Sequence, residues 1–412
     1  MNIYQLKVMA RILFFAPAFA PNLFSEGLVN SKLALSMLLA GWEVEVVAVD
    51  ASGSSYSSTW DAVWMPLKEI RHDVDSSLNG PKLLSTLNRM WRLRHPIQGM
   101  HWAANAVDRA IELHDEKPFD MVLSRSTSCM AHLPALAFKK LTGCRWVANW
   151  NDPAPYLFPW PYDYRMVWWK KLLFSRYMRD CAAAADFNSF PSAPLRDYLS
   201  PHLGLKDREK MLVIPHIAMP DFQPPGYEKG NGFSMCHAGN LSSERNPKLF
   251  LKALKRLQEQ YPETPMSFEI IGVKSADVSQ IVADLKMDGV VSFVSGLPFQ
   301  QTLEKLCTYD INVIIEADCS NGIFMPSKLT DYAQANRPML AVSPARGVVK
   351  DWLKEYGGGL AASNVNEADI YEKLEELFLA WKNDETCAYQ PTKIAALTMP
   401  EFILKEYKTL FV

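Results

Sequence analysis

The chain has no CxxC pair, no HxxxH spacing, no GxGxxG turn after an apolar run and no apolar stretch of 18 residues. These absences exclude a cysteine-based zinc or redox motif, a zinc-protease helix, a nicotinamide dinucleotide turn and a membrane-spanning helix. The seven cysteines stand singly, so we interpret them as reduced, buried thiols of a cytoplasmic protein. A net charge of only −2 lacks the basic character of nucleic-acid-binding proteins.

The N-terminus is ambiguous on composition alone. Lys7 and Arg11 precede an apolar run that is similar to a signal peptide. Pro17 and Pro21 interrupt this run, and a helical pattern and a strand then follow at the spacing of a β-loop-α-β unit. We therefore interpret residues 9 onward as the start of the fold and residues 1–8 as an extension.

Apolar runs alternate with helical patterns along the chain, which is typical of βαβ units and parallel sheets. In the first half we expect strands at 12–16, 44–49, 121–124, 146–149 and 211–215, and helices at 27–39, 99–114 and 131–141. After a linker at 220–232, we expect strands at 234–238, 267–271, 290–294, 311–315, 339–342 and 360–362, and helices at 247–261, 276–285, 302–307, 328–336, 348–356 and 366–383. The predicted class is α/β, with doubly wound Rossmann-like domains at 1–218 and 219–394, and with 395–412 packing back on the first.

Residues 322–338 carry the most functional information. An Asn-Gly turn runs through Pro326 and Ser327 into a helical pattern that Lys328 opens, directly after an apolar strand. A helix start offers free backbone N–H groups and the positive end of the helix dipole, which suit a phosphate. Lys328 adds a full charge, and Asp331 could accept sugar hydroxyls. This arrangement predicts a nucleotide-diphosphate site.

Six short sequence motifs follow one another along the chain: 213–216 (VIPH), 238–241 (AGNL) followed by Glu244 and Arg245, 270–272 (IIG), 294–296 (VSG), 326–332 (PSKLTDY) and 337–341 (RPMLA). In these motifs the chain resembles the GT-B glycosyltransferases, in particular the retaining, family 4-like enzymes of bacterial polysaccharide biosynthesis. The resemblance implies two Rossmann-like domains facing a central cleft. It also implies a hexosyltransferase-type, metal-independent enzyme without a cofactor, whose donor is a UDP-, GDP- or TDP-sugar.

The resemblance also assigns residues. It implies that donor-binding residues are Gly239, Asn240, Arg245, Lys274, Gly322, Ser327, Lys328 and Asp331. Asn240 stands where the family usually has Arg, and Asp331 where it has Glu. The first glutamate of the family's paired motif would fall eight residues before Asp331, where Ile323 stands. That departure leaves both the donor-sugar contact and the stereochemistry open.

Strand ends in open α/β sheets line ligand crevices, which selects candidates in the first domain. Ser25, Glu26 and Gly27 follow the first strand, and Asn151 and Asp152 follow a later one. We expect these residues on the acceptor side, with Ser124, Arg125 and Ser126 as further candidates. Asp152 is either a base for the acceptor hydroxyl or the cap of a turn before proline. His237, just before Gly239, either touches ligand or is structural.

Two segments, 89–95 and 166–179, combine aromatic with basic residues. Such helices either lie at an anionic membrane surface or pack by their apolar face with solvated cations. Membrane contact at the inner face of the cytoplasmic membrane would suit a lipid-linked acceptor.

We expect Arg245, Lys328 and the 322–328 backbone to stabilise the departing phosphate. With retention the leaving phosphate itself accepts the proton, whereas inversion requires a carboxylate such as Asp152. The expected partners are a nucleotide-sugar donor and a glycan or lipid-linked acceptor. The alternatives are a nucleotide-sugar 2-epimerase of the same fold and a non-catalytic binding subunit.

Overall fold

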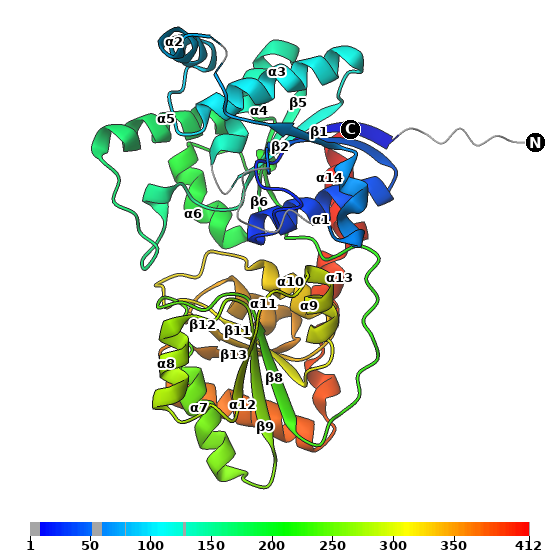
Figure 1. Cartoon of the computed structure of the whole chain (residues 1–412), viewed down its shortest axis with the longest axis vertical. Coiled ribbons are helices and arrows are strands. Elements are labelled where there is room, and N and C mark those ends of the chain that lie inside the picture. Colours follow the sequence, from blue (N-terminus) through cyan, green and yellow to red (C-terminus); the bar gives the residue numbers. More distant parts are fainter. Residues whose placement is uncertain (1–8, 52–59, 79, 127–128, 412) are drawn as a thin grey trace, which may run out of the picture. The chain divides into compact units, whose positions relative to one another are not determined.

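The computed structural model describes residues 9–51, 60–78, 80–126 and 129–411. The described residues form two compact units (Figure 1). Unit 1 contains the described residues of 1–158, 163–220 and 400–412, and unit 2 contains 159–162 and 221–399. The expected extension at 1–8 lies outside the described residues.

In the described part of unit 1, seven parallel strands form one sheet in the order β3-β2-β1-β4-β5-β6-β7. They are β3 (Arg71–Val74), β2 (Trp42–Val49), β1 (Met9–Phe15), β4 (Met121–Ser126), β5 (Arg145–Trp150), β6 (Phe187–Phe190) and β7 (Met211–Val213). The inner strands are apolar on both faces because helices cover both faces of a parallel sheet. Phe15 pairs with Ser124 and Arg125 with Asn149, which sets the carboxyl ends of β1, β4 and β5 side by side.

The helices of unit 1 are α1 (Ser25–Leu39), α2 (Lys82–Leu93), α3 (Met100–Glu116), α4 (His132–Thr142), α5 (Trp168–Ala184), α6 (Ala193–Leu203) and α14 (Pro400–Lys408). Right-handed crossovers put α3, α4, α5 and α6 on one face of the sheet and α1 on the other. Consistent with this, α4 contacts both α3 and α5, whereas α1 contacts α14 from the end of the chain.

In the described part of unit 2, six parallel strands follow the order β10-β9-β8-β11-β12-β13. They are β10 (Val291–Val294), β9 (Met266–Ile271), β8 (Phe233–Ala238), β11 (Ile311–Ile315), β12 (Met339–Ser343) and β13 (Gly359–Ser363). The helices are α7 (Lys248–Gln260), α8 (Ala276–Asp284), α9 (Phe299–Leu306), α10 (Ser327–Gln334), α11 (Val348–Tyr356), α12 (Glu367–Lys382) and α13 (Thr392–Thr398). The helix α12 packs on α7, and a core of both strands and helices includes Phe233, Phe268 and Phe378.

The predicted α/β class with two doubly wound sheets is confirmed. Several elements were not predicted, among them two strands and a helix of unit 1. The short strands β3 and β6 were not predicted, because their sequences, RHDV and FNSF, carry little apolar pattern. The helix α6 was not predicted either, although Ser192 caps it by accepting a hydrogen bond from the N–H of Leu195. No helix in the described residues has the length and apolar character needed to cross a bilayer.

Candidate functional site

Each sheet has one point where its strand order reverses direction. In unit 1 this point lies between β1 and β4, and in unit 2 between β8 and β11. Loops leaving the carboxyl ends of such neighbouring strands diverge to opposite faces and leave a crevice that binds ligands in open α/β folds. Gly239 directly follows β8, and Glu316 directly follows β11. The strongest cluster of predicted site residues therefore lies at the switch point of unit 2.

The start of α10 supplies backbone donors to this crevice. Ser327 and Lys328 form the first turn of α10, and no side-chain hydrogen bond caps it. The N–H groups of a first helical turn lack intrahelical partners and carry the positive end of the helix dipole. Asp331, one turn later, is buried. The helix is fixed to β8 because the Tyr332 hydroxyl accepts a hydrogen bond of 2.7 Å from the N–H of Ala238.

Gly239 and Lys328 fit one another. Gly239 has φ +126°, a backbone region that side chains rarely adopt, and a Cβ at this position would overlap Cε and Nζ of Lys328. The Gly239 N–H donates to the Ile271 carbonyl at 2.7 Å, which holds the turn in place. The Lys328 ammonium therefore lies directly against the Gly239 backbone. Only glycine permits that approach.

Arg245 lies on the exposed loop between β8 and α7. Its Nε donates to the Tyr162 hydroxyl at 3.2 Å, and its guanidinium lies 6.0 Å from the centre of the Tyr162 ring. Tyr162 in turn meets Phe324 edge to face, with the ring centres 6.1 Å apart. Tyr162 thus links the Arg245 loop to the loop that leads into α10.

Glu316 is a candidate site residue that was not predicted from the sequence. Its half-buried carboxyl interacts electrostatically with both Arg245 and Lys328. Burial raises the pKa of Glu316 to about 7, and the two cations oppose that rise. Burial lowers the pKa of Lys328 to about 7, with Arg245 acting in the same direction and Glu316 and Asp331 opposing it. The signal that could have found Glu316 is its place as the first residue after the predicted strand 311–315, at a strand end.

His237 lies on β8 beneath this cluster and is fully buried. Its Nδ1 lies 2.9 Å from the Val313 carbonyl, so Nδ1 carries the proton and donates. Burial, and next the charge of Lys328, hold the pKa of His237 well below its usual range. The imidazole is therefore neutral, and its Nε2 acceptor has no hydrogen-bond partner among the described residues.

Three predicted donor residues have other partners. The Gly322 N–H donates to the Arg346 carbonyl at 2.9 Å, so this amide is engaged within the protein and cannot serve as a phosphate donor. Asn240 Oδ1 accepts from the Val273 N–H at 2.9 Å, which ties two strand-end loops together. Lys274 is exposed and lies 5.1 Å from the centre of the Phe293 ring. Gly322 is therefore not a candidate phosphate donor, whereas the start of α10 remains one.

A second cluster lies at the switch point of unit 1. The buried Glu26, in the first turn of α1, accepts hydrogen bonds of 2.8 and 2.9 Å from Nδ2 of Asn151. Asn151 Oδ1 accepts in turn from Arg125 at 3.2 Å. Burial raises the pKa of Glu26, and the Arg125 charge and the hydrogen bond from Asn151 oppose the rise. The structure brings together three candidates from three different elements.

The remaining unit 1 candidates surround this cluster. Gly27 has no room for a Cβ, which would overlap the Asn22 carbonyl oxygen, so the β1–α1 loop packs directly on the helix. Ser25 is exposed at the start of α1, and Asp152 is half-buried after β5. The side chain of Ser126 lies outside the described residues.

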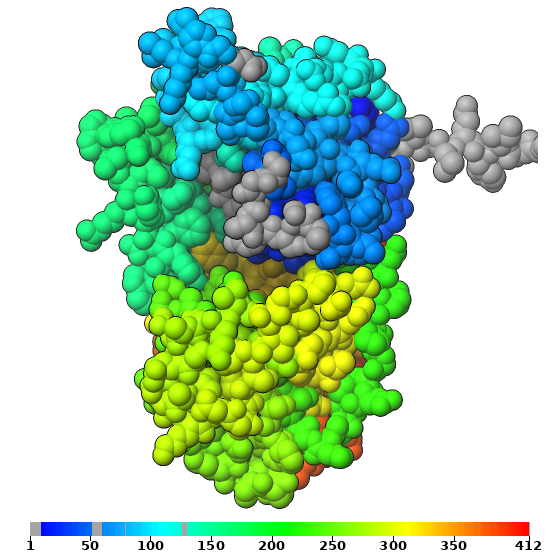
Figure 2. All heavy atoms as spheres, in the orientation of Figure 1, coloured from blue at the N-terminus to red at the C-terminus, as the bar shows by residue number. Residues whose placement is uncertain are grey.

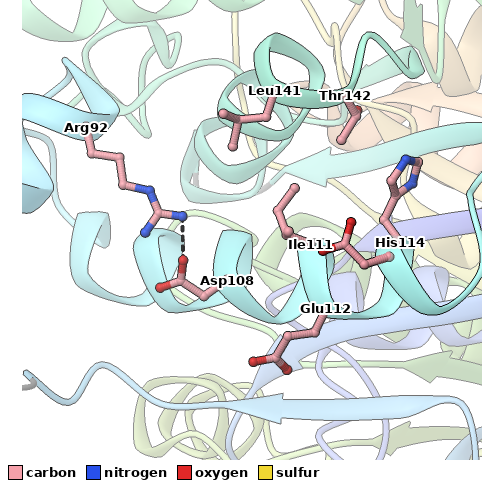
Figure 3. Close-up of a pocket in the computed structure, with 8 residues that line it drawn as sticks. Arg92, Asp108, Ile111, Glu112, His114, Leu141 and Thr142 are labelled. Carbon is pink, nitrogen blue, oxygen red and sulfur yellow. Dashed lines mark ion pairs between the residues drawn. The ribbon is translucent and has the colours of Figure 1, made fainter.

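A surface pocket on unit 1 lies apart from these clusters (Figure 3). It lies on the outer surface of α3 and α4 and is lined by Arg92, Asp108, Ile111, Glu112, His114, Asp115, Leu141 and Thr142. It contains none of the predicted donor or acceptor residues. Among the described residues, no group of three or more His, Cys, Asp or Glu side chains could hold a metal ion.

Solved structures of known proteins have a similar fold. Sucrose-phosphate synthase from Thermosynechococcus elongatus aligns with a TM-score of 0.67 at 11% identity over 98% of both chains. The Anabaena protein HepE, solved in complex with UDP and glucose, aligns with a TM-score of 0.63 at 10% identity over 97% of this chain and 98% of that one. The UDP-GlcNAc 2-epimerase from Neisseria meningitidis, bound to UDP-GlcNAc, aligns with a TM-score of 0.56 at 12% identity over 97% of this chain and 100% of that one.

With two Rossmann-like units of this kind, the protein has the GT-B fold, as its sequence predicted. A comparison with curated protein sequences finds no match. Residues 29–216 match the family described as the glycosyl transferase 4-like domain. The family match therefore lies in unit 1, whereas most of the short motifs that carry the sequence resemblance lie in unit 2.

Proposed function

We propose that this protein is a glycosyltransferase that moves a sugar from a nucleotide-diphosphate donor to a glycan or lipid-linked acceptor hydroxyl. The observation that carries the proposal is the contact of the Lys328 ammonium with the Gly239 backbone at the uncapped start of α10, beside Arg245 and Glu316. Two cations and helical N–H groups converge at a switch-point crevice. This chemistry fits a pyrophosphate.

The same groups serve the chemical step. Negative charge grows on the departing diphosphate as the anomeric bond breaks. Cations that are held in place before the reaction lower the barrier because they interact more strongly with that charge than with the intact donor. Lys328 and Arg245 supply this stabilisation from the protein itself, so we propose a reaction that requires no metal ion or cofactor.

We propose that Glu26 and Asn151 of unit 1 bind the acceptor. Glu26 and Asn151 offer a carboxylate and an amide that can orient a hydroxyl group. We further propose retention of the anomeric configuration, with the leaving phosphate accepting the acceptor proton. Asp152 then positions the acceptor rather than acting as its base. The setting we propose is bacterial surface polysaccharide synthesis on the cytoplasmic side.

Donor binding can be tested by thermal shift with UDP, GDP and TDP and their sugars, since a ligand that binds only the folded state raises its melting temperature. The variants Lys328→Ala and Arg245→Ala should lose both the shift and sugar transfer. Lys354→Ala, which removes an exposed lysine on α11 of the same unit, is the matched control and should retain both. Full transfer activity in both test variants would contradict the proposal.

A second candidate is a nucleotide-sugar 2-epimerase, because the Neisseria epimerase shares the fold over nearly the whole chain. An epimerase converts its donor without any acceptor. Incubation of the protein with UDP-GlcNAc alone, followed by analysis of the sugar by NMR, separates the two. We expect no C2-epimerised product, since the family match in unit 1 is to a glycosyl transferase domain.

A further inference from the structure

The helix α2 exposes its apolar side to solvent. Leu83, Leu84, Leu87, Met90 and Trp91 follow the spacing of one helical face, and Leu83 and Trp91 are 71% and 75% exposed. Apolar helical faces normally point into the protein core. Leu93 is the one apolar residue of α2 that is buried among the described residues. The exposed face therefore lacks a partner in the described part of the chain.

Polar contacts on the opposite side hold α2 in this orientation. Arg89 is buried and donates at 2.6 Å to Asn105 of α3 and at 2.7 Å to the Ser77 carbonyl. One turn later, Arg92 forms an ion pair of 2.5 Å with Asp108 of α3, and Figure 3 shows this pair at the edge of the pocket. Both arginines thus point at α3. The fold itself presents the apolar face outward, with α2 standing out from unit 1 in Figure 2.

The start of α5 is a second exposed apolar segment of unit 1. Trp168 is 77% exposed, and Trp169 and Leu172 are also exposed. The two helices are joined because His95, just after α2, meets the Tyr177 ring of α5 edge to face at 5.3 Å and lies 3.4 Å from the Asp180 carboxylate. Both helices also contact α4. The apolar residues of α2 and α5 therefore belong to one side of unit 1.

Cations predominate around these residues. Arg89 and Arg92 are turned toward α3, but Lys82 and Arg94 are exposed on and next to α2. Residues 164–179 contain five Lys or Arg and no acid, with Asp163 and Asp180 on either side. The whole chain carries a net charge of −2, so this concentration of positive charge is local. Two copies of the face would repel each other. An anionic lipid surface matches both its cations and its apolar side chains.

We propose that α2 and the start of α5 form a docking face for an anionic phospholipid bilayer, with Leu83, Leu84, Leu87 and Trp91 inserted at the headgroup level. The sequence expectation named 89–95 and 166–179. The face differs from the first segment because Arg89, Leu93 and His95 are buried, whereas the start of α5 lies within the second. The inference does not depend on the proposed sugar transfer. It concerns a surface formed by helices that cover the sheet, not the strand-end clusters.

The test is co-sedimentation with vesicles of phosphatidylcholine, with and without phosphatidylglycerol. We expect binding only with phosphatidylglycerol, and weaker binding at high salt. The variant Leu84→Glu/Trp91→Glu should lower the partition coefficient at least about tenfold, since burying one large apolar side chain is worth about 1.5–3 kcal/mol. Lys170→Glu/Lys171→Glu should lower it as well, since each cation near an anionic surface contributes about fivefold.

The matched control is Leu39→Glu, at a leucine of α1 that is 55% exposed on the other face of the sheet. It should bind like the unmodified protein, and unchanged thermal unfolding of all variants checks their folding. Equal binding of Leu84→Glu/Trp91→Glu, or no binding of the unmodified protein to phosphatidylglycerol vesicles, would overturn the proposal. A dimer that this variant dissociates, together with no vesicle binding, would instead assign the face to a second copy of the chain.

Discussion

Donor binding should take up protons at neutral pH, because Lys328 is only half charged in the ligand-free protein. Burial lowers the pKa of Lys328 to about 7, from an ordinary value of 10.5. A bound diphosphate favours the protonated ammonium and raises that pKa again. The nucleotide therefore binds best to the protonated form, and its affinity should fall as the pH rises above 7.

The size of the effect follows from the pKa. With a pKa of about 7, the lysine is about half protonated at pH 7 and about 1% protonated at pH 9. If only the protonated form binds, the apparent affinity falls roughly fiftyfold over this range, or about 2.3 kcal/mol. The phosphates themselves are already ionised there, since their second pKa is near 6. Proton uptake should be about 0.5 at pH 7 and about 0.9 at pH 8.

Calorimetric titration with UDP, GDP or TDP, whichever binds, in buffers of different ionisation enthalpy measures this uptake directly. Lys328→Arg is the decisive variant, since a guanidinium stays charged throughout this range. The nucleotide affinity of this variant should depend much less on pH. We attribute any pH dependence of the affinity that remains to Glu316, because burial raises its pKa to about 7. The double variant Lys328→Arg/Glu316→Gln should therefore bind the nucleotide equally well at pH 7 and pH 9.

A change in the affinity of the unmodified protein of less than about threefold between pH 7 and pH 9, in place of about fiftyfold, would show that Lys328 does not titrate in this range. An unchanged pH dependence in both Lys328→Arg and the double variant would refute the role of Lys328 equally. The nucleoside without phosphates is the control ligand, and its binding should show no such proton uptake.

Three further predictions follow from the same geometry. Gly239→Ala should abolish donor binding, as measured by calorimetry. It should also lower the free energy of unfolding in urea by about 1–3 kcal/mol, because alanine is strained at this φ. Lys328→Met should raise the melting temperature of the ligand-free protein at pH 7. The folded-state pKa of Lys328 lies below its unfolded value, so the charge opposes folding below pH 7 and ceases to do so as the pH approaches 10.5. Asp152→Asn should keep sugar transfer within about tenfold and give a product with retained configuration by NMR, whereas loss of a general base would cost 10²–10⁴-fold.

The sequence predicted best those elements whose signals are local. The strand β11 has the predicted bounds, and α10 begins within one residue of its prediction, because a buried apolar strand and a proline before a helix are readable in a short window. The edge strand β3 could not be predicted in this way. Its residues pair with β2 only through tertiary contacts, such as the contact of His72 with Glu45 at 2.7 Å.

The site was predicted in part for the same reason. Gly239 and Lys328 were expected in one site, and the structure brings them into contact, although they lie far apart in the sequence. Glu316 was missed because the paired acid was sought at a fixed spacing before Asp331, where Ile323 stands. Its neighbours Arg245 and Lys328 come from other strand-end loops, so only the strand order places the three together. The orientation of α2 could not be predicted for the same reason. Its arginines are held by Asn105 and Asp108, which belong to α3.

The half-charged lysine also bears on how the proposed reaction could release its product. A nucleoside diphosphate carries more negative charge than the nucleotide sugar from which it forms, so it should interact more strongly with Lys328 and Arg245. The same difference exists between the intact donor and the transition state, which is the condition for catalysis by those cations. Tight binding of the product is then an unavoidable consequence, and Glu316 would moderate it. Once ionised, its carboxylate opposes the diphosphate, so Glu316→Gln should strengthen inhibition by the nucleoside diphosphate more than it changes binding of the nucleotide sugar.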